Sequence, residues 1–373
     1  MISVIGDSII DIYYHGVMDR RSPESPILIF KQDYTETKQG GSGNVVANLL
    51  ALGQNPKHYF STNSTKFRYV CDNTIVFRSD KEEYVANTLC NFDLQDIKYC
   101  ILSDYNKGYL HNSQAVIDYC HSKNCIVIVD PKKDLGNYKN ADIIKLNIKE
   151  LNNFSPFGND YRKIRKTYNI KALVVTLGAD GVYIDSDEYS GQIAGIAHQV
   201  SDVTGAGDVF IAAMTHFLSL NNSLYDSCYK ANLLASISVT KFGTYVVTPE
   251  DIKQTKVVFT NGCFDILHKG HIEYLKESKK LGSKLIVGLN SDESVKRLKG
   301  NSRPVNNQND RKAVLEAVGF VDEVIIFDED TPYELIKKIK PDIITKGGDY
   351  TVDTVVGNDL AEVIIIPTTE GYS

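Results

Sequence analysis

Short apolar runs recur along the first two thirds of the chain, and several of them end in a polar or acidic residue. The run at residues 2–5 is followed closely by Asp7, and the run at 125–129 is followed by Asp130. Runs of this length that are apolar throughout are typical of strands buried on both faces. Between them lie segments with the apolar spacing of helices, such as 112–123. This alternation predicts a doubly wound α/β domain, in which polar residues gather at the strand ends.

A second series of the same kind begins after residue 256. Residues 257–259 form a β-branched and aromatic run, and a Thr-Asn-Gly string breaks it as a strand-to-loop turn does. The segment that follows has apolar residues at positions that suit one face of a helix, which places His268 and His271 at the start of that helix. We therefore expect a second, Rossmann-like α/β domain.

The length of the chain agrees with two domains. At 373 residues it is longer than one domain of average size. We predict a first domain at 1–248, a short linker at 249–256 and a second domain at 257–373. Within the first domain the pattern is weak between residues 54 and 102.

Composition and charge exclude several classes of protein. Apolar residues make up 42% and charged residues 24% of the chain, as in ordinary globular proteins. A net charge of −6 argues against a nucleic-acid-binding surface. The seven cysteines form no CxxC pair, and neither a signal leader nor an apolar run of membrane-spanning length is evident. We therefore expect a cytoplasmic protein that binds neither nucleic acid nor membranes.

The histidine pair carries the first chemical prediction. Backbone N–H groups and the helix dipole favour a phosphate at a helix start, and Gly270 lets it approach the backbone. Two imidazoles aimed at one phosphate favour nucleotidyl transfer, because donors in a dry cleft stabilise the charge that develops on the phosphate oxygens. The alternative is a capped helix with two surface histidines. The string TNGCFD ahead of the pair favours the site.

The string Gly205-Ala206-Gly207-Asp208 carries the second prediction. Its backbone N–H groups can hold a transferring phosphoryl group, and Asp208 can accept a proton from a substrate hydroxyl. The alternative, a helix N-cap, leaves the glycines unexplained. Earlier in the chain, carboxylates and a glycine-rich helix start suit the hydroxyls of a polyol. The candidate substrate contacts there are Asp7, Asp11, Gly40, Gly41 and Asn44.

These motifs resemble two known families. The strings GGSGN, DPK, NIKE, TLGADG and DVTGAGD follow the order found in ribokinase-like sugar kinases, and RRSPESP and SDYNKG narrow the likeness to heptose-phosphate kinases. TNGCFD with the histidine pair resembles cytidylyltransferases and sugar-phosphate adenylyltransferases. The whole chain resembles the bifunctional heptose 7-phosphate kinases / heptose 1-phosphate adenylyltransferases. Their fold is a ribokinase-like doubly wound domain followed by a Rossmann-like HxGH nucleotidyltransferase domain. A class I aminoacyl-tRNA synthetase would need a KMSKS-like loop, which is not evident here.

The resemblance implies two steps in the synthesis of ADP-heptose, a lipopolysaccharide precursor. ATP phosphorylates the anomeric position of heptose 7-phosphate, and an adenylyl group from ATP is joined to heptose 1-phosphate with release of pyrophosphate. The partners are thus ATP and sugar phosphates, with Mg²⁺ accompanying ATP and a homodimer as the candidate assembly.

The resemblance also implies site residues. Asp208, His268 and His271 are the candidate catalytic residues, Lys107 is a further substrate contact, and Glu150 is the candidate Mg²⁺ ligand. Lys296, Arg297, Lys299 and Arg303 form a basic loop that is expected to hold the triphosphate, with a solvated basic turn as the alternative. The candidate nucleotide contacts of the kinase are Asn147, Glu150, Thr176, Gly178, Gly181, Gly205, Ala206, Gly207 and Asn232. Those of the transferase are Thr260, Asn261, Gly262, Phe264, Asp265, Lys296, Arg297, Lys299, Lys346, Gly347 and Asp349.

The chain departs from the family pattern in three places, one of which is the short linker at 249–256. Between residues 54 and 102 it looks shorter than its relatives by a βα unit, and it ends before the family's Ser/Thr-rich C-terminal signature. Two alternatives therefore stand beside the bifunctional enzyme. One is a monofunctional nucleotidyltransferase with an inactive kinase-like scaffold, and the other is a non-catalytic sensor of sugar phosphates or nucleotides. The presence of Asp208 and both histidines argues against the sensor, because binding alone needs no general base.

Overall fold

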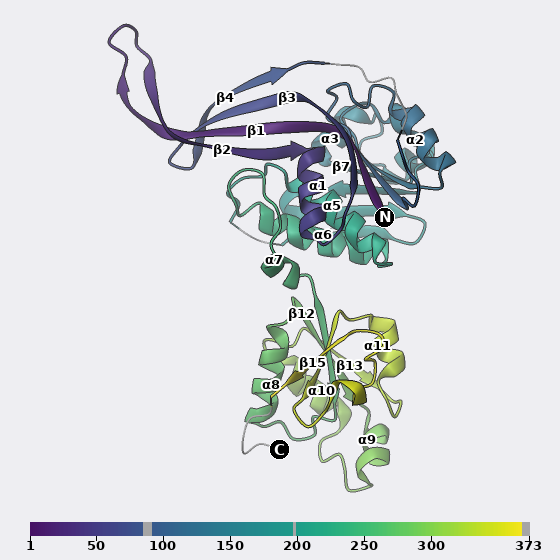
Figure 1. Ribbon diagram of the computed structural model, residues 1–373. Coiled ribbons are helices and arrows are strands. Elements are labelled where there is room, and N and C mark those ends of the chain that lie inside the picture. The colour runs from purple at the N-terminus through teal and green to yellow at the C-terminus, as the bar shows by residue number, and fades with distance from the viewer. Residues whose placement is uncertain (85–91, 197–198, 368–373) are drawn as a thin grey trace. The chain divides into compact units, whose positions relative to one another are not determined.

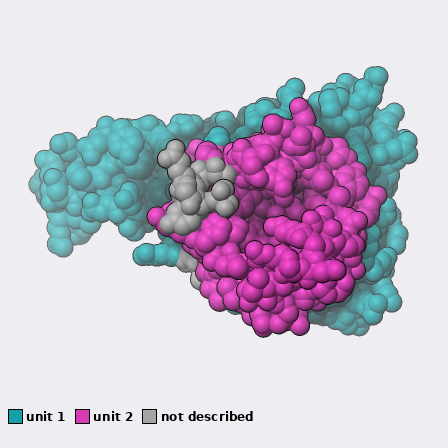
Figure 2. Space-filling view, turned by 90° about the horizontal axis from the view of Figure 1, so that it is seen from below, with its two compact units in different colours: residues 1–249 teal, residues 250–373 magenta. Residues whose placement is uncertain are grey.

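Figure 1 shows the computed structural model of the chain, which describes residues 1–84, 92–196 and 199–367. The chain divides into two compact units, Met1–Pro249 and Glu250–Ser373 (Figure 2). This division lies at the start of the predicted linker. The last residues of the chain, where we expect the family signature to be missing, lie outside the described residues.

The described part of the first unit contains a sheet of ten strands. They are β1 (Ile2–Arg21), β2 (Leu28–Gly41), β3 (Lys57–Cys71), β4 (Thr74–Glu82), β5 (Tyr99–Ser103), β6 (Ile126–Asp130), β7 (Ile143–Asn147), β8 (Ala172–Thr176), β9 (Gly181–Ser186) and β10 (Ser190–Ala194). The start of β1 and the strands β5 to β8 run parallel side by side, and β9 and β10 extend that edge antiparallel. The parallel strands are almost wholly buried, which explains why they are apolar without alternation.

The length of β1 differs from the prediction, which ended this strand at residue 5. Beyond Asp7 the strand continues with alternating burial, so that Ile9, Asp11 and Tyr13 are buried. There it pairs with β2 on one side and β3 on the other, and β4 pairs with β3. Residues 8–21 of β1 with β2, β3 and β4 extend together from the sheet as a ribbon, here called the β-ribbon (Figure 1). A buried carboxylate among apolar residues concealed this strand from the sequence pattern.

Helices cover both faces of this sheet. They are α1 (Ser42–Ala51), α2 (Ser113–Ser122), α3 (Ile148–Phe154), α4 (Tyr161–Thr167), α5 (Ala206–Ser219) and α6 (Leu224–Ser238), with the short 3₁₀ helices η1 (Leu135–Tyr138) and η2 (Gly178–Asp180). Helices α2, α3 and α4 share one hydrophobic core with residues such as Leu102 and Val127 of the sheet. Helices α1, α5 and α6 pack together, and α1 and α5 contact the strands. The first unit therefore has the doubly wound arrangement that the sequence predicts.

The described part of the second unit contains a five-stranded parallel sheet in the order β13-β12-β11-β14-β15. Its elements are α7 (Pro249–Lys253), β11 (Val257–Gly262), α8 (Lys269–Lys279), β12 (Lys284–Asn290), α9 (Asp292–Lys299), α10 (Gln308–Glu316), β13 (Glu323–Phe327), α11 (Tyr333–Ile339), β14 (Ile343–Gly347), η3 (Val352–Thr354) and β15 (Glu362–Ile366). Separate hydrophobic cores contain Val258 and Phe259, two neighbours on β11 whose side chains point to opposite faces. The strand order reverses between β11 and β14, so a ligand crevice is expected at the carboxyl ends of these two strands.

In the part of the chain that the structure describes, no helix is both long and apolar enough to cross a membrane.

Candidate active sites

Asp208 lies in the first turn of α5 and is held by two segments far away in the sequence. The Asn44 side chain donates a hydrogen bond of 3.0 Å to Asp208 Oδ2, and the Tyr105 hydroxyl donates one of 2.7 Å to Oδ1. The carboxyl group is buried, and burial raises its pKa to about 6, although both hydrogen bonds lower it. A carboxylate that titrates near neutral pH and is fixed in orientation has the properties of a general base.

The glycines before Asp208 pack tightly against polar side chains. Gly205 has a left-handed backbone with φ 78°, and a Cβ there would lie 2.8 Å from Asn44 Nδ2. A Cβ on Gly207 would lie 2.7 Å from Lys145 Nζ. The Thr244 hydroxyl is buried without a hydrogen-bond partner among the described residues, next to Gly205. Small residues here therefore leave room for a lysine, an amide and a hydroxyl around the helix start, which suits an anion.

Lys145 belongs to a group of charged side chains that was not predicted from the sequence motifs. Its ammonium lies 3.3 Å from Asp130 Oδ2 at the end of the neighbouring strand, and Lys132 also pairs with Asp130. The two lysines lower the pKa of Asp130 against the effect of burial. The signal was present in the sequence, because a lysine inside an apolar strand is rarely buried without a partner.

Asp7 is engaged by the loop after β5. Its carboxylate accepts backbone hydrogen bonds from Tyr105, Lys107 and Tyr109 at 2.9, 3.1 and 3.0 Å. Burial raises the pKa of Asp7, and these hydrogen bonds oppose the shift. The Lys107 ammonium lies 2.6 Å from Glu82 of the β-ribbon. The structure thus brings the predicted substrate contacts Asp7 and Lys107 together through one loop.

Asp11 lies on the β-ribbon and forms a buried ion pair with Arg68 of β3. A Cβ on Gly40 would lie 2.4 Å from Asp11 Oδ2, and one on Gly41 would lie 2.5 Å from the Asp7 carbonyl oxygen. The two glycines therefore let β2 pass close to both carboxylates. The pattern Lys66-x-Arg68 on a strand was the signal that could have revealed the partner of Asp11.

The predicted nucleotide contacts of the kinase lie at strand and helix ends. Asn147 and Glu150 form a capping box at the start of α3, and the second oxygen of Glu150 accepts a hydrogen bond from Lys132. Asn232 donates to the Ala194 carbonyl oxygen at 3.1 Å. Thr176 ends β8, and Gly178 and Gly181 begin and follow η2 with positive φ. No group of three or more potential metal ligands occurs among the described residues.

The second unit has a cavity of about 940 Å³ at the carboxyl ends of β11 and β14, the predicted crevice. His268 and His271 both line it, with ring centroids 3.9 Å apart, and Phe264 lies 5.3 Å from the His271 ring. His268 is the extended N-cap residue of α8, so the helix start faces the cavity. Burial, His268 and Lys299 lower the pKa of His271. A neutral imidazole in this position can donate one ring N–H to a phosphate.

Two polar atoms of this cavity are left without protein partners. His271 Nδ1 and Asn261 Oδ1 are buried and have no hydrogen-bond partner among the residues that the structure describes. Lys346 donates to the Asn261 carbonyl oxygen at 3.0 Å, and burial lowers its pKa to about 8. Buried polar atoms are normally paired, so the unpaired His271 Nδ1 and Asn261 Oδ1 indicate where a polar ligand binds. Of the predicted contacts, Asn261, Gly262, Phe264, Asp265, Lys299, Lys346, Gly347 and Asp349 line the cavity with the histidines.

The basic segment after residue 295 differs from the predicted loop, because its first part is helix α9. Lys299 lines the cavity, whereas Lys296 pairs with Glu293 at 2.7 Å and Arg297 pairs with Asp330 at 2.7 Å, both outside the lining. Thr260 is buried and does not line the cavity, but its hydroxyl lies 2.7 Å from that of Tyr274, which does.

Asp265 positions the segment that follows α9. Its carboxylate accepts hydrogen bonds from the backbone of Val305 and Asn306 and from the Arg303 side chain, at 2.8, 3.0 and 2.8 Å. Together with Lys299, Arg303 lines the cavity. The Asp265 carboxylate would itself repel a triphosphate. Its hydrogen bond from Arg303, however, holds that cation at the cavity.

Arg311 joins several loops around the cavity, and sequence reasoning missed it. Its guanidinium is buried and donates to the carbonyl oxygens of Cys263, Asn290 and Asn306 and to the Asp292 carboxylate, at 2.6, 2.9, 2.9 and 2.7 Å. An arginine on the inner face of a helix was the signal that could have found it.

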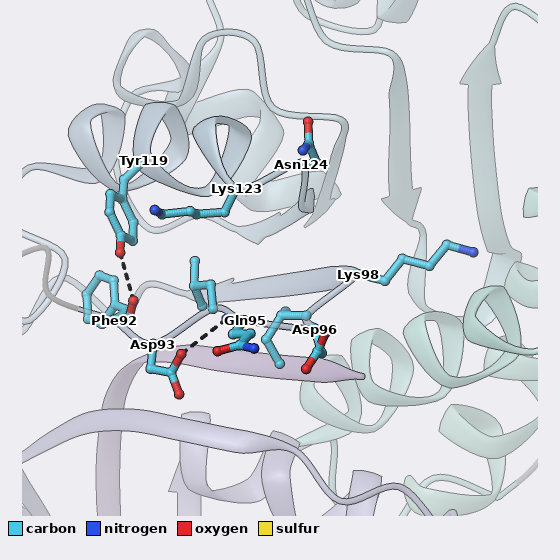
Figure 3. A pocket seen from close by; sticks show the side chains of 10 residues that line it. Phe92, Asp93, Gln95, Asp96, Lys98, Tyr119, Lys123 and Asn124 are labelled. Atoms are coloured by element: carbon cyan, nitrogen blue, oxygen red, sulfur yellow. Dashed lines mark hydrogen bonds between the residues drawn. The ribbon is translucent and has the colours of Figure 1, made fainter.

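A further cavity of about 700 Å³ lies elsewhere in the first unit (Figure 3). It is lined by residues 92–98 and by Tyr119, Lys123 and Asn124 around the end of α2. The Tyr119 hydroxyl donates to the Phe92 carbonyl oxygen at 2.8 Å. This cavity lies at the beginning of β5, whereas the Asp208 site lies beyond its end, and it contains none of the predicted site residues.

Comparison with known proteins identifies the class of each unit. Residues 61–251 match the family model of the pfkB family carbohydrate kinases, and residues 259–365 match the cytidylyltransferase-like model. Ribokinase from Thermotoga maritima superposes with a TM-score of 0.54 at 19% identity and covers 68% of this chain and 98% of its own. Phosphofructokinase-2 from Escherichia coli gives 0.55 at 16%, covering 68% and 96%. The chain is therefore a transferase with a ribokinase-like kinase domain and a nucleotidyltransferase domain.

The particular family follows from closer relatives. The bifunctional protein HldE of Nitratiruptor sp. is 37% identical over 100% of this chain and 97% of its own length. The HldE proteins of Campylobacter curvus and Helicobacter pylori strain J99 are both 36% identical, over 100% of this chain and 96% of their own. The chain belongs to the family of the bifunctional protein HldE. The Nitratiruptor alignment spans 451 positions against the 373 residues present here, so that relative has segments without a counterpart in this chain.

Proposed function

We propose that this enzyme catalyses two steps of ADP-heptose synthesis: phosphorylation of heptose 7-phosphate at its anomeric hydroxyl, and adenylyl transfer to heptose 1-phosphate. The proposal rests on one observation. The chain combines a buried general-base carboxylate at a helix start with a pair of imidazoles at the switch point of a separate sheet. The heptose comes from the family likeness, and the two chemical steps come from the sites.

In the kinase step, Asp208 takes the proton of the anomeric hydroxyl. The hydroxyl oxygen then forms a bond to the γ-phosphorus of ATP, and the bond between that phosphorus and the ADP oxygen breaks. Backbone N–H groups at Gly205 and Gly207 would face the transferred group, whereas the predicted contact Ala206 donates its N–H to the Val203 carbonyl oxygen at 3.3 Å. Lys145 lies beside Gly207 and would offset the charge of the transferred group. Asp7, Asp11, Asn44 and Lys107 are the proposed contacts of the sugar.

In the transfer step, the phosphate oxygen of the sugar 1-phosphate attacks the α-phosphorus of ATP, and the bond to pyrophosphate breaks. Charge rises on the α-phosphate oxygens as the new bond forms. His268 and His271 would donate their ring N–H groups to these oxygens, and Lys299, Arg303 and Lys346 would offset the charge of the leaving pyrophosphate. Between the steps, the family likeness implies that a separate phosphatase removes the 7-phosphate.

Mg²⁺ is proposed only as the companion of ATP. One oxygen of Glu150 caps α3 and the other accepts from Lys132, so this carboxylate does not fit the role of a metal ligand as it stands. Phosphate oxygens and water commonly provide most Mg²⁺ ligands in such enzymes. No step above depends on the metal.

Separate assays of the purified full chain test the proposal. With ATP, the chain should release ADP in the presence of heptose 7-phosphate and pyrophosphate in the presence of heptose 1-phosphate. Glucose 6-phosphate and glucose 1-phosphate serve as matched substrates of a shorter sugar. Pyrophosphate release without any ADP release would favour the scaffold alternative, and nucleotide binding without either reaction would favour the sensor.

A further inference from the structure

Tyr105 connects the two carboxylates of the kinase site. It follows β5 in the loop that the sequence string SDYNKG encodes. Its backbone N–H donates to Asp7 Oδ2 at 2.9 Å, and its hydroxyl donates to Asp208 Oδ1 at 2.7 Å. A proposed substrate contact and the proposed base are therefore tied to the same residue.

The charges around Tyr105 determine which group carries the proton. Burial and the negative charges of Asp208, Asp130 and Glu150 raise the pKa of the Tyr105 hydroxyl well above its usual value, so the phenol stays protonated and acts as the donor. Two cations face the ring: Lys132 Nζ lies 5.2 Å and Lys66 Nζ 5.9 Å from its centroid. Lys145, which pairs with Asp130, lowers the pKa of Asp208 by its positive charge.

The orientation of the Asp208 carboxylate depends on both of its donors. Asn44 holds Oδ2 and Tyr105 holds Oδ1, so the planar group cannot rotate without losing a hydrogen bond. Each carboxylate oxygen can accept a second hydrogen bond, which leaves a place for a substrate hydroxyl. Alignment of a base with its proton matters, because a misplacement of about 1 Å can lower a rate roughly 10²-fold.

We propose that Tyr105 is a positioning residue of the kinase reaction, which holds Asp208 in its charged form and in the orientation that accepts the proton of the sugar hydroxyl. The inference rests on the proposed kinase function. It goes beyond that function because Tyr105 acts through Asp208 and takes no part in the transfer itself.

The test is the pH profile of the kinase reaction in Tyr105→Phe. The wild-type rate should fall below a pH of about 6, where Asp208 becomes protonated. Without the phenol, the carboxylate loses a charge-assisted hydrogen bond, and the acid limb should move up by about one pH unit or more. At the plateau, kcat should fall roughly 10–10²-fold, and the KM of the sugar phosphate should change less.

A matched control is Tyr138→Phe. Tyr138 is buried and, like Tyr105, donates its hydroxyl to an aspartate, here Asp104 Oδ2 at 2.7 Å. The control also removes a phenolic hydroxyl that donates to an aspartate, next to the loop that contains Tyr105. It should therefore lower the stability of the chain without moving the acid limb of the kinase pH profile. Pyrophosphate release by the second unit and the thermal unfolding of each variant show whether the chain is folded.

Three results would overturn the inference. An acid limb that stays in place in folded Tyr105→Phe would show that the phenol does not support the charge of Asp208. A faster Tyr105→Phe variant would show that the phenol blocks the base. An equal shift in Tyr138→Phe would show that any loss of packing moves it. A wild-type chain without kinase activity would instead overturn the proposed kinase function, and the inference with it.

Discussion

The two candidate sites hold their reactive groups in different ways. At the kinase site, both carboxylate oxygens of Asp208 accept hydrogen bonds from the protein. The donors are Asn44 and Tyr105, which lie far in sequence from the helix that carries the base. At the transferase site, His271 Nδ1 and Asn261 Oδ1 are left without partners among the described residues, and the reactive side chains line an open cavity.

This difference reflects what positions each site. The kinase base depends on side-chain hydrogen bonds between segments that meet only in the folded unit. The histidines depend on backbone features, a strand end and a helix start, which follow directly from the local fold. The kinase site should therefore respond to substitutions of supporting side chains, and the transferase site should respond mainly to loss of its reactive groups.

Removal of the base gives the largest expected effect and tests the first half of this comparison. Asp208→Asn should lower the kinase rate roughly 10²–10⁴-fold, because an amide cannot take the hydroxyl proton. Pyrophosphate release by the same preparation should be unchanged. Asp226→Asn is the matched control, since Asp226 is also acidic and in the first turn of a helix, α6. A kinase rate in Asp208→Asn equal to that of the control would contradict the assignment.

Replacement of a histidine tests the second half. His271→Ala and His268→Ala should each lower kcat for pyrophosphate release by roughly 10²–10³-fold, the effect of losing one donor to a developing oxyanion. The KM of ATP should change much less, because the donors act mainly on the transition state. Kinase activity should remain. His111→Ala, an exposed histidine of the first unit, is the control. A normal kcat with a much higher KM would show that the histidines only bind ground-state ATP.

The sequence predicted what local rules determine. Three features follow from short-range patterns: polar residues after apolar strands, glycines at the start of α5 and histidines at the start of α8. Their positions in the structure agree with these patterns. Tyr105 and Arg311 were missed because their roles depend on partners that are distant in sequence. Tyr105 reads as part of a loop motif until the structure brings it to Asp208, 103 positions further along the chain.

The basic segment shows a second limit of sequence reasoning. Lys296, Arg297 and Lys299 read as one cluster, but helix α9 turns its side chains in different directions. Lys299 points to the cavity, and Arg297 pairs with Asp330 on another side. Whether Lys296 and Arg297 contact the triphosphate stays a prediction.

Arg311 offers an exception to the contrast between the sites, because it supports the transferase site through side-chain hydrogen bonds. Arg311→Met should leave three carbonyl oxygens and Asp292 without their donor and destabilise the second unit by about 2–4 kcal/mol. Heating should then abolish pyrophosphate release at a lower temperature than kinase activity. Lys312→Met, at the neighbouring and only partly buried position of α10, is the control. Equal heat inactivation of the variant and the control would show that the loops hold their positions without the guanidinium.

The smallest expected effect concerns Lys346, and it sharpens the comparison by pH. Burial lowers the pKa of Lys346 to about 8, so the ammonium is charged at neutral pH and becomes neutral as the pH rises through that value. A neutral amine attracts a triphosphate less, so the KM of ATP for pyrophosphate release should rise by up to about tenfold between pH 7 and 9. His271 does not interfere in this range, because its pKa is lowered from 6.5.

Lys346→Met should have a high KM at both pH values, whereas exposed Lys337→Met should keep the wild-type dependence. Lys346 lines only the cavity of the second unit, so the KM of ATP for ADP release should not follow the same curve. Parallel curves for the two reactions would mean that the dependence arises from ATP itself, and Lys346 would then be a structural contact of Asn261 alone.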